Sequence, residues 1–165
     1  MGLEAQTMLE PLWRGLPPID PGAVAGSASC ALPAEYGAVS GARKFTTSTL
    51  RHWQLDGLCD DVALVVSELV TNALRHACPD RGTGALDPPV RLHIMRWSSR
   101  LVCAVRDPSC DSPVAGEAGF AEESGRGLFL VDSFSDGWGW HPLAGSLRGK
   151  VVWALFHLSP PAPGA

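Results

Sequence analysis

One segment limits the possible folds of this chain more than any other: a long amphipathic helix near the middle of the sequence. Apolar residues recur there every three or four positions, as on the buried side of a helix: Val62, Ala63, Val66, Leu69, Val70, Ala73, Leu74 and Ala77. The pattern begins after Asp56 or Gly57 and stops before Pro79, which cannot continue a helix. Because a helix with one apolar side must bury it, the chain has to build at least one further layer.

Alternating residues predict that this second layer is a sheet. Val90-Leu92-Ile94 and Leu101-Cys103-Val105 alternate with a period of two around Ser98-Ser99, which predicts a hairpin. The mostly apolar residues 151–158 predict a buried strand, and residues 27–32 a short one. Further helices are expected at 35–53 and 125–134. We therefore predict an α/β two-layer sandwich, with a mixed, mostly antiparallel sheet and helices on one face.

Proline and glycine mark the ends of the folded part. Of the 14 prolines, half lie in the two tails. We expect a flexible N-terminal extension over residues 1–26, a single domain over 27–158 and a disordered tail over 159–165. The extension nevertheless carries Leu12, Trp13 and Leu16, which are apolar enough to dock on another surface.

Composition excludes several classes of function. Hydrophobic residues make up 45% of the 165, enough for the core of one domain. The net charge of -4 argues against direct nucleic-acid binding, which relies on clustered basic side chains. There is no run of eighteen apolar residues to cross a membrane and no secretory signal pattern. Five cysteines without a C-x-x-C pair favour reduced thiols in the cytoplasm.

The long helix carries a strip of polar residues beside its apolar side. Glu68, Asn72 and His76 are spaced i, i+4 and i+8, which places them one above another. An asparagine oxygen suits Mg²⁺, and a carboxylate can accept a proton or orient a water. On its own this spacing fits the ordinary edge of an amphipathic helix better than a ligand site.

Two further motifs follow the helix. Asp107 ends a predicted strand before Pro108, where a carboxylate could accept hydrogen bonds from an exocyclic amine or could simply begin a turn. Gly125-Arg126-Gly127 leads into an apolar helix, where backbone N–H groups and the positive helix end favour an anion. A plain junction between loop and helix would also explain it.

The order of these motifs resembles the ATP-binding fold shared by gyrase, heat-shock chaperones, histidine kinases and MutL, known as the Bergerat fold. The greatest similarity is to serine kinases that act as anti-sigma factors in bacteria. The resemblance spans roughly residues 27 to 158. It is carried by Glu-Leu-Val-Thr-Asn-Ala-Leu-Arg-His-Ala (68–77), Val-Arg-Asp-Pro-Ser (105–109), Glu-Ser-Gly-Arg-Gly-Leu-Phe-Leu-Val (123–131), Trp-Gly (138–139) and Gly-Lys-Val-Val-Trp (149–153).

The resemblance implies a role for each matching residue. Asn72 would coordinate the Mg²⁺ that bridges the ATP phosphates, Glu68 would be the general base for a serine hydroxyl, and Asp107 would recognise the adenine amine. Residues 109–124 would form a lid over the nucleotide. The remaining positions expected around the cofactor are His76, Ser109, Gly125, Arg126, Gly127 and Leu128.

The activity implied is phosphorylation of a serine on an anti-sigma-factor antagonist, combined with sequestration of a sigma factor by a homodimer. Ser109 stands where the family usually has a glycine, and the lid is short and poor in glycine. A non-catalytic module whose partner binding is gated by nucleotide is therefore the main alternative. A nucleotide-free scaffold and a metal-dependent hydrolase are the others.

Overall fold

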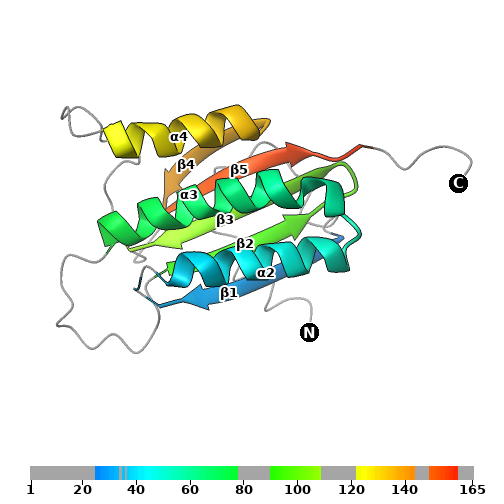
Figure 1. Ribbon diagram of the computed structural model, residues 1–165, viewed down its shortest axis with the longest axis horizontal. Helices are drawn as coiled ribbons and strands as arrows, with labels where there is room; N and C mark the ends of the chain where they lie inside the picture. Colours follow the sequence, from blue (N-terminus) through cyan, green and yellow to red (C-terminus); the bar gives the residue numbers. More distant parts are fainter. Residues whose placement is uncertain are drawn as a thin grey trace, which may run out of the picture.

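The computed structural model describes residues 25–33, 35, 37–77, 90–108, 122–143 and 149–159. The helices and strands form one layered body (Figure 1). In chain order these are β1 (Gly26–Leu32), α2 (Ala38–His52), the 3₁₀ turn η2 (Asp56–Leu58), α3 (Cys59–Ala77), β2 (Val90–Arg96), β3 (Arg100–Asp107), α4 (Glu122–Phe134), β4 (Gly137–Pro142) and β5 (Lys150–His157). The flexible extension and the disordered tail were predicted for segments that lie almost entirely outside the described residues.

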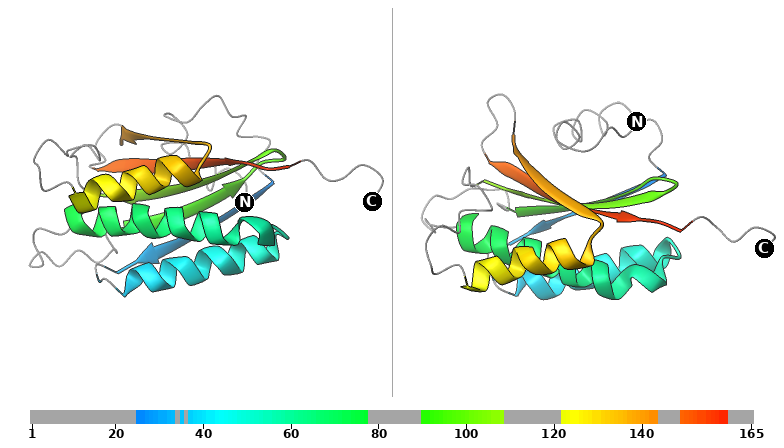
Figure 2. Two further views of the ribbon diagram at one scale, coloured as in Figure 1. Left: turned by 45° about the horizontal axis from the view of Figure 1, so that its top comes forward. Right: turned by 90° about the horizontal axis from the view of Figure 1, so that it is seen from above.

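The five strands form one sheet in the order β1-β2-β3-β5-β4. Figure 2 shows α2, α3 and α4 on the same side of this sheet, which confirms the predicted two-layer sandwich. Each pairing among the described strands is antiparallel, so the parallel pairs implied by a mixed sheet are not found there. The reason is that α2 and α3 both lie between β1 and β2, so the chain reverses its direction three times and β2 runs antiparallel to β1.

The core lies between the helices and the inner face of the sheet. Cys103, on the central strand β3, is fully buried there, and this burial raises the pKa of its thiol to about 12. The same core takes one side of each helix: Ala42 and Leu50 from α2, Val62, Val66, Leu69 and Val70 from α3, and Val131 from α4. This is the apolar stripe that the sequence pattern predicts for α3.

A second group of apolar side chains lies on the outer face of the sheet, away from the helices. We call it the outer cluster: Met95, Trp97, Val102, Ala104, Leu143, Val151, Trp153 and Leu155, all of which are buried. Trp153 depends on a glycine in the neighbouring strand, because a Cβ at Gly139 would approach its ring to 2.6 Å. Both faces of the sheet are therefore apolar and shielded from solvent.

Two helices begin elsewhere than predicted. The α2 helix starts at Ala38 rather than at 35, because Glu35 takes part in a turn with bonds from its N–H to the Pro33 carbonyl and from the Ala38 N–H to its own carbonyl. The α4 helix starts at Glu122, three residues before the predicted Gly125. Glutamate is favoured in the first turn of a helix, where it interacts well with the helix dipole, so Glu122 and Glu123 outweigh the glycines that follow.

Because successive elements run in opposite directions, the connections fall at two ends of the sandwich (Figure 1). At one, the turn end, the connections are the short segments 53–55, 97–99 and 135–136. At the other, the loop end, β1 ends before α2, α3 ends before β2, β3 ends before α4, and β4 ends before β5. The loop end also holds the last turns of α3, the end of β3 and the starts of α4 and β5.

Candidate functional site

The polar strip of α3 is present as predicted. Glu68 and Asn72 are one helical turn apart and both are half-buried, between the core side of the helix and solvent. The nearby hydroxyls bond to the helix itself: Ser67 Oγ donates to the Ala63 carbonyl (2.7 Å) and Thr71 Oγ1 to the Ser67 carbonyl (2.7 Å). The carboxylate of Glu68 and the amide of Asn72 are therefore the groups on this part of α3 best suited to meet a ligand.

His76 lies in the last turn of α3, at the loop end. Its side chain lies outside the described part of the structure, so its place around a cofactor stays a prediction.

Asp107 is the last residue of β3 and only 2% exposed. It faces Lys150, the first residue of β5 and its direct neighbour in the sheet register, which is 1% exposed. Lys150 Nζ donates to Asp107 Oδ1 over 3.1 Å. The pair brings two opposite charges into a low-dielectric environment, where each depends on the other for its stabilisation.

Sequence reasoning assigned no role to Lys150. The sequence feature that could have indicated a role is a lysine at the start of an otherwise apolar strand. A lysine buried in such a strand is expected to pair with an acidic residue, because lysine is rarely fully buried otherwise. Which acid it would pair with depends on the register of β3 against β5, and the two residues are 43 positions apart.

Gly149, which precedes Lys150, lies very close to the backbone of Asp107. It has a φ of +119°, and a Cβ at this position would lie 2.1 Å from the Asp107 carbonyl oxygen. A side chain is excluded both by this conformation and by this contact. Gly149 thus lets the start of β5 approach the end of β3 closely enough for Lys150 to reach Asp107.

The start of α4 points its positive helix end toward the loop end (Figure 1). Gly125, Arg126 and Gly127 fall within the first two turns of this helix, so their N–H groups follow the helical hydrogen-bonding pattern rather than forming a separate turn. Leu128 is half-buried. The side chain of Arg126, all of Ser109 and residues 110–121 of the predicted lid lie outside the described residues, and their roles stay predictions. The last part of the predicted lid, residues 122–124, is instead the first turn of α4.

These parts converge because α3 packs against β3 on one side and α4 on another. The loop end thereby combines a carboxylate acceptor at Asp107, the last turns of α3 with the amide of Asn72, and the start of α4. Glu68 lies one helical turn before Asn72 on α3. The profile of the histidine kinase-like ATPase domain matches residues 32–154, which is most of the chain and includes all of these elements. The chain belongs to this family. No curated protein sequence matches it significantly.

A histidine kinase-like ATPase domain binds ATP, and the residues present fit that nucleotide. Asp107 suits the exocyclic amine of adenine: although Lys150 engages Oδ1, a carboxylate has two oxygens and can accept several hydrogen bonds. The start of α4 suits phosphate oxygens. Asn72 supplies an oxygen of the kind that Mg²⁺ prefers.

Two negative findings complete the description of this ATPase domain. Within the described ranges, no group of three His, Cys, Asp or Glu side chains is arranged to hold a metal ion. None of the helices found there is long and apolar enough to span a membrane.

Proposed function

We propose that this histidine kinase-like ATPase domain is a cytoplasmic, ATP-binding regulator of the anti-sigma-factor type. It phosphorylates a serine of an antagonist protein and sequesters a sigma factor. The observation that supports the proposal is that Asp107, the last turns of α3 with Asn72, and the start of α4 lie at one end of a domain of this family, with Glu68 one helical turn before Asn72.

Each residue has a distinct task in this proposal. Asn72 holds Mg²⁺ against the phosphates, and Asp107, oriented by Lys150, selects the base. Glu68 accepts the proton of the serine hydroxyl as that oxygen attacks. Bound Mg·ATP supplies the phosphoryl group, and the protein contributes mainly positioning and charge neutralisation, which suffice for phosphoryl transfer.

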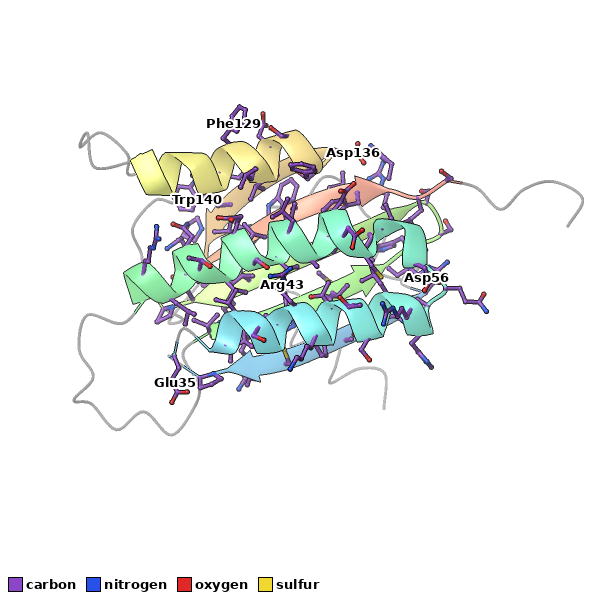
Figure 3. All side chains as sticks on the ribbon, viewed as in Figure 1. Glu35, Arg43, Asp56, Phe129, Asp136 and Trp140 are labelled. Carbon is purple, nitrogen blue, oxygen red and sulfur yellow. The ribbon has the colours of Figure 1, made fainter. Side chains whose placement is uncertain are left out.

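The surface of α4 and β4 supports a role that involves protein partners. The exposed large apolar residues of the described part gather on these two elements: Phe129 (67% exposed), Phe134 (41%) and Trp140 (36%). Figure 3 shows Phe129 on the outer side of α4, pointing away from the body. Large exposed aromatic side chains on two adjoining elements are a feature of interaction surfaces. A homodimer stays a prediction that a mass measurement in solution would test.

Thermal melting with and without Mg·ATP tests the nucleotide site. At a hundred times the dissociation constant, the ligand should add about 2.7 kcal/mol, which is a rise of roughly 5–10 °C for a domain of this size. Asn72→Ala should lose the rise, whereas Glu68→Gln on the same strip should keep it. No rise in the parent protein at millimolar nucleotide would contradict ATP binding.

Asp107 needs a compensated variant in this experiment, because Asp107→Asn alone leaves the buried Lys150 ammonium without its counter-charge. The double variant Asp107→Asn, Lys150→Met removes both charges together. We expect it to remain folded and to lose the rise caused by ATP. A full rise in this variant would show that Asp107 does not select the base.

Transfer of labelled γ-phosphate to co-purifying proteins tests the kinase. Phosphoserine should form on a partner with the parent protein and be absent with Glu68→Gln, while both bind ATP equally. Equal phosphorylation by the two would rule out Glu68 as the base.

The non-catalytic module remains the second candidate, because the early start of α4 at Glu122 takes Gly125 and Gly127 into regular helix. Partner binding that depends on ATP, without any transfer of phosphate, would favour that module.

A further inference from the structure

The helices do not explain why the side chains of the outer cluster are buried. Its side chains are between 0% and 8% exposed, yet α2, α3 and α4 all lie on the other face of the sheet (Figure 2). A central group such as Met95, Val102 and Val151 cannot be buried by its own sheet, because strand side chains point straight out of the sheet plane. A further layer of apolar material must therefore cover this face.

Two buried polar atoms on the same face show how closely the covering layer must approach the sheet. Trp153 Nε1 and His93 Nδ1 are buried and have no hydrogen-bond partner among the described residues. Burial, together with the charges of Arg91 and Arg106, lowers the pKa of His93 to about 4. The cover is thus close enough to remove water from His93.

Charge adds a second requirement. Arg91 on β2 and Arg106 on β3 are direct cross-strand neighbours on this face, and like charges in that position repel each other. A covering segment that carries carboxylates would relieve this repulsion. A segment that fits the outer face of the sheet should therefore be apolar in its middle and carry acidic residues elsewhere.

The N-terminal residues 1–24 meet both requirements. They contain the acidic residues Glu4, Glu10 and Asp20, against one basic residue, Arg14. Their large apolar residues are Leu3, Met8, Leu9, Leu12, Trp13, Leu16 and Ile19. This composition matches an apolar centre with arginines at its margin.

The point at which this segment joins the body also fits. The Ala25 N–H donates to the Arg96 carbonyl over 2.7 Å, so the chain enters β1 beside the end of β2, next to Met95 and Trp97 of the outer cluster. Twenty-four residues can extend to about 80 Å, whereas five strands are only about 20 Å across. Four prolines, which lack an N–H, disfavour addition of the segment as a further strand at the β1 edge.

We propose that residues 1–24 fold back over the outer face of the sheet and cover the outer cluster. Leu12, Trp13 and Leu16 pack on the apolar centre, and the carboxylates face Arg91 and Arg106. The sandwich then has a third layer, made by its own N-terminal segment. This inference is independent of the nucleotide site and stands or falls separately from the proposed function.

Photo-crosslinking in the full chain tests the proposal. A p-benzoylphenylalanine replaces Trp13, and equal amounts of isotope-labelled and unlabelled chains are mixed, irradiated and mapped by mass spectrometry. We expect crosslinks within one chain, to peptides of β2, β3 or β5 that carry the outer cluster. The matched control has the crosslinker at Phe129, which is exposed on α4 and should give no link to these strands.

The other outcomes overturn the proposal. Links between labelled and unlabelled chains would assign the face to a second copy, and links to α2, α3 or α4 would place the segment elsewhere. The absence of links to the sheet would show that position 13 does not cover it.

A second measurement does not depend on crosslinking. Trp13→Asp should expose the outer cluster and raise the fluorescence of a hydrophobic dye such as ANS several-fold, while the helix-facing core keeps a cooperative melt. Ala162→Asp adds the same charge in the C-terminal tail and should leave the dye signal at the parent level. Equal signals from both variants would contradict the proposal.

Discussion

The two ends of the sandwich are held together in different ways. At the turn end, hydrogen bonds tie separate elements: Arg96 Nη1 donates to the Trp53 carbonyl (2.7 Å), and the Leu158 N–H donates to the Ser99 carbonyl (2.8 Å). At the loop end, the ends of β3 and β5 are joined by the buried charges of Asp107 and Lys150. The turn end is therefore held by hydrogen bonds to backbone carbonyls, whereas the loop end contains a buried ion pair.

The candidate site and the buried pair that stabilises the sheet therefore lie at the same end of the molecule. Short connections at the turn end fix how the helices lie on the sheet. The longer connections all fall at the loop end, where the elements present Asp107, Asn72 and the start of α4. Binding residues carried on a rigid scaffold near long connections are a common arrangement in enzymes.

The largest effect is expected from Lys150→Met, which leaves the Asp107 carboxylate buried without a counter-charge. Removing one partner of such a pair costs about 3–5 kcal/mol, and the free energy of unfolding from urea titration measures it. The double variant Asp107→Asn, Lys150→Met should recover most of the loss. A single variant as stable as the parent would show that the pair does not hold the loop end.

Glycine substitutions compare the two ends directly. Gly149→Ala at the loop end forces a positive φ on a side chain that meets the Asp107 carbonyl, at a cost of about 3 kcal/mol. Gly57→Ala at the turn end meets no atom within 4 Å, so a change of at most about 0.5 kcal/mol is expected. Thermal melts of both variants measure the difference, and similar losses would remove this contrast between the ends.

Acidification should destabilise the folded protein through His93, which lies on β2 between the two ends of the sandwich. The pKa of His93 is lowered from 6.5 to about 4, so the unfolded chain binds its proton first as the pH falls. Stability present above pH 6.5 should therefore be lost between pH 6.5 and 4, by about 2–3 kcal/mol. Urea titrations across this range should show the loss, and His93→Gln should reduce it.

The smallest effect is expected at the turn end from Arg96→Met. It removes the hydrogen bond to the Trp53 carbonyl, worth about 1–2 kcal/mol for a charged donor. Arg43 is an exposed arginine on α2 (Figure 3), and Arg43→Met should change stability by no more than about 0.5 kcal/mol. Equal effects from the two would mean that the bond between Arg96 and Trp53 does not help to close this end.

Sequence periodicity was sufficient for most of the fold, since burial on one side of each element decides both the pattern and the packing. It predicted α3 and the hairpin of β2 and β3 almost to the residue. It was less successful at the start of α4, where Gly125 and Gly127 favour a turn but Glu122 and Glu123 favour a helix. The local signals compete there, and the two glutamates in the first turn outweigh the glycines that follow.

The candidate site shows a different limit. Glu68 and Asn72 could be predicted to lie together because one helix carries both. The partner of Asp107 could not, because Lys150 meets it only through the register of β3 against β5. The close contact at Gly149 has the same origin, since a single glycine before a strand does not reveal which backbone it will touch.

Because Cys103 is buried, chemical modification of its thiol can report global unfolding. With a pKa of about 12 and no exposed surface, it offers an alkylating reagent almost no thiolate while the chain is folded. Because it lies on the central strand, between the two ends, its modification requires the sheet and the helices to separate. The rate at which the alkylating reagent labels Cys103 under native conditions would therefore report how often the whole domain opens in the absence of denaturant.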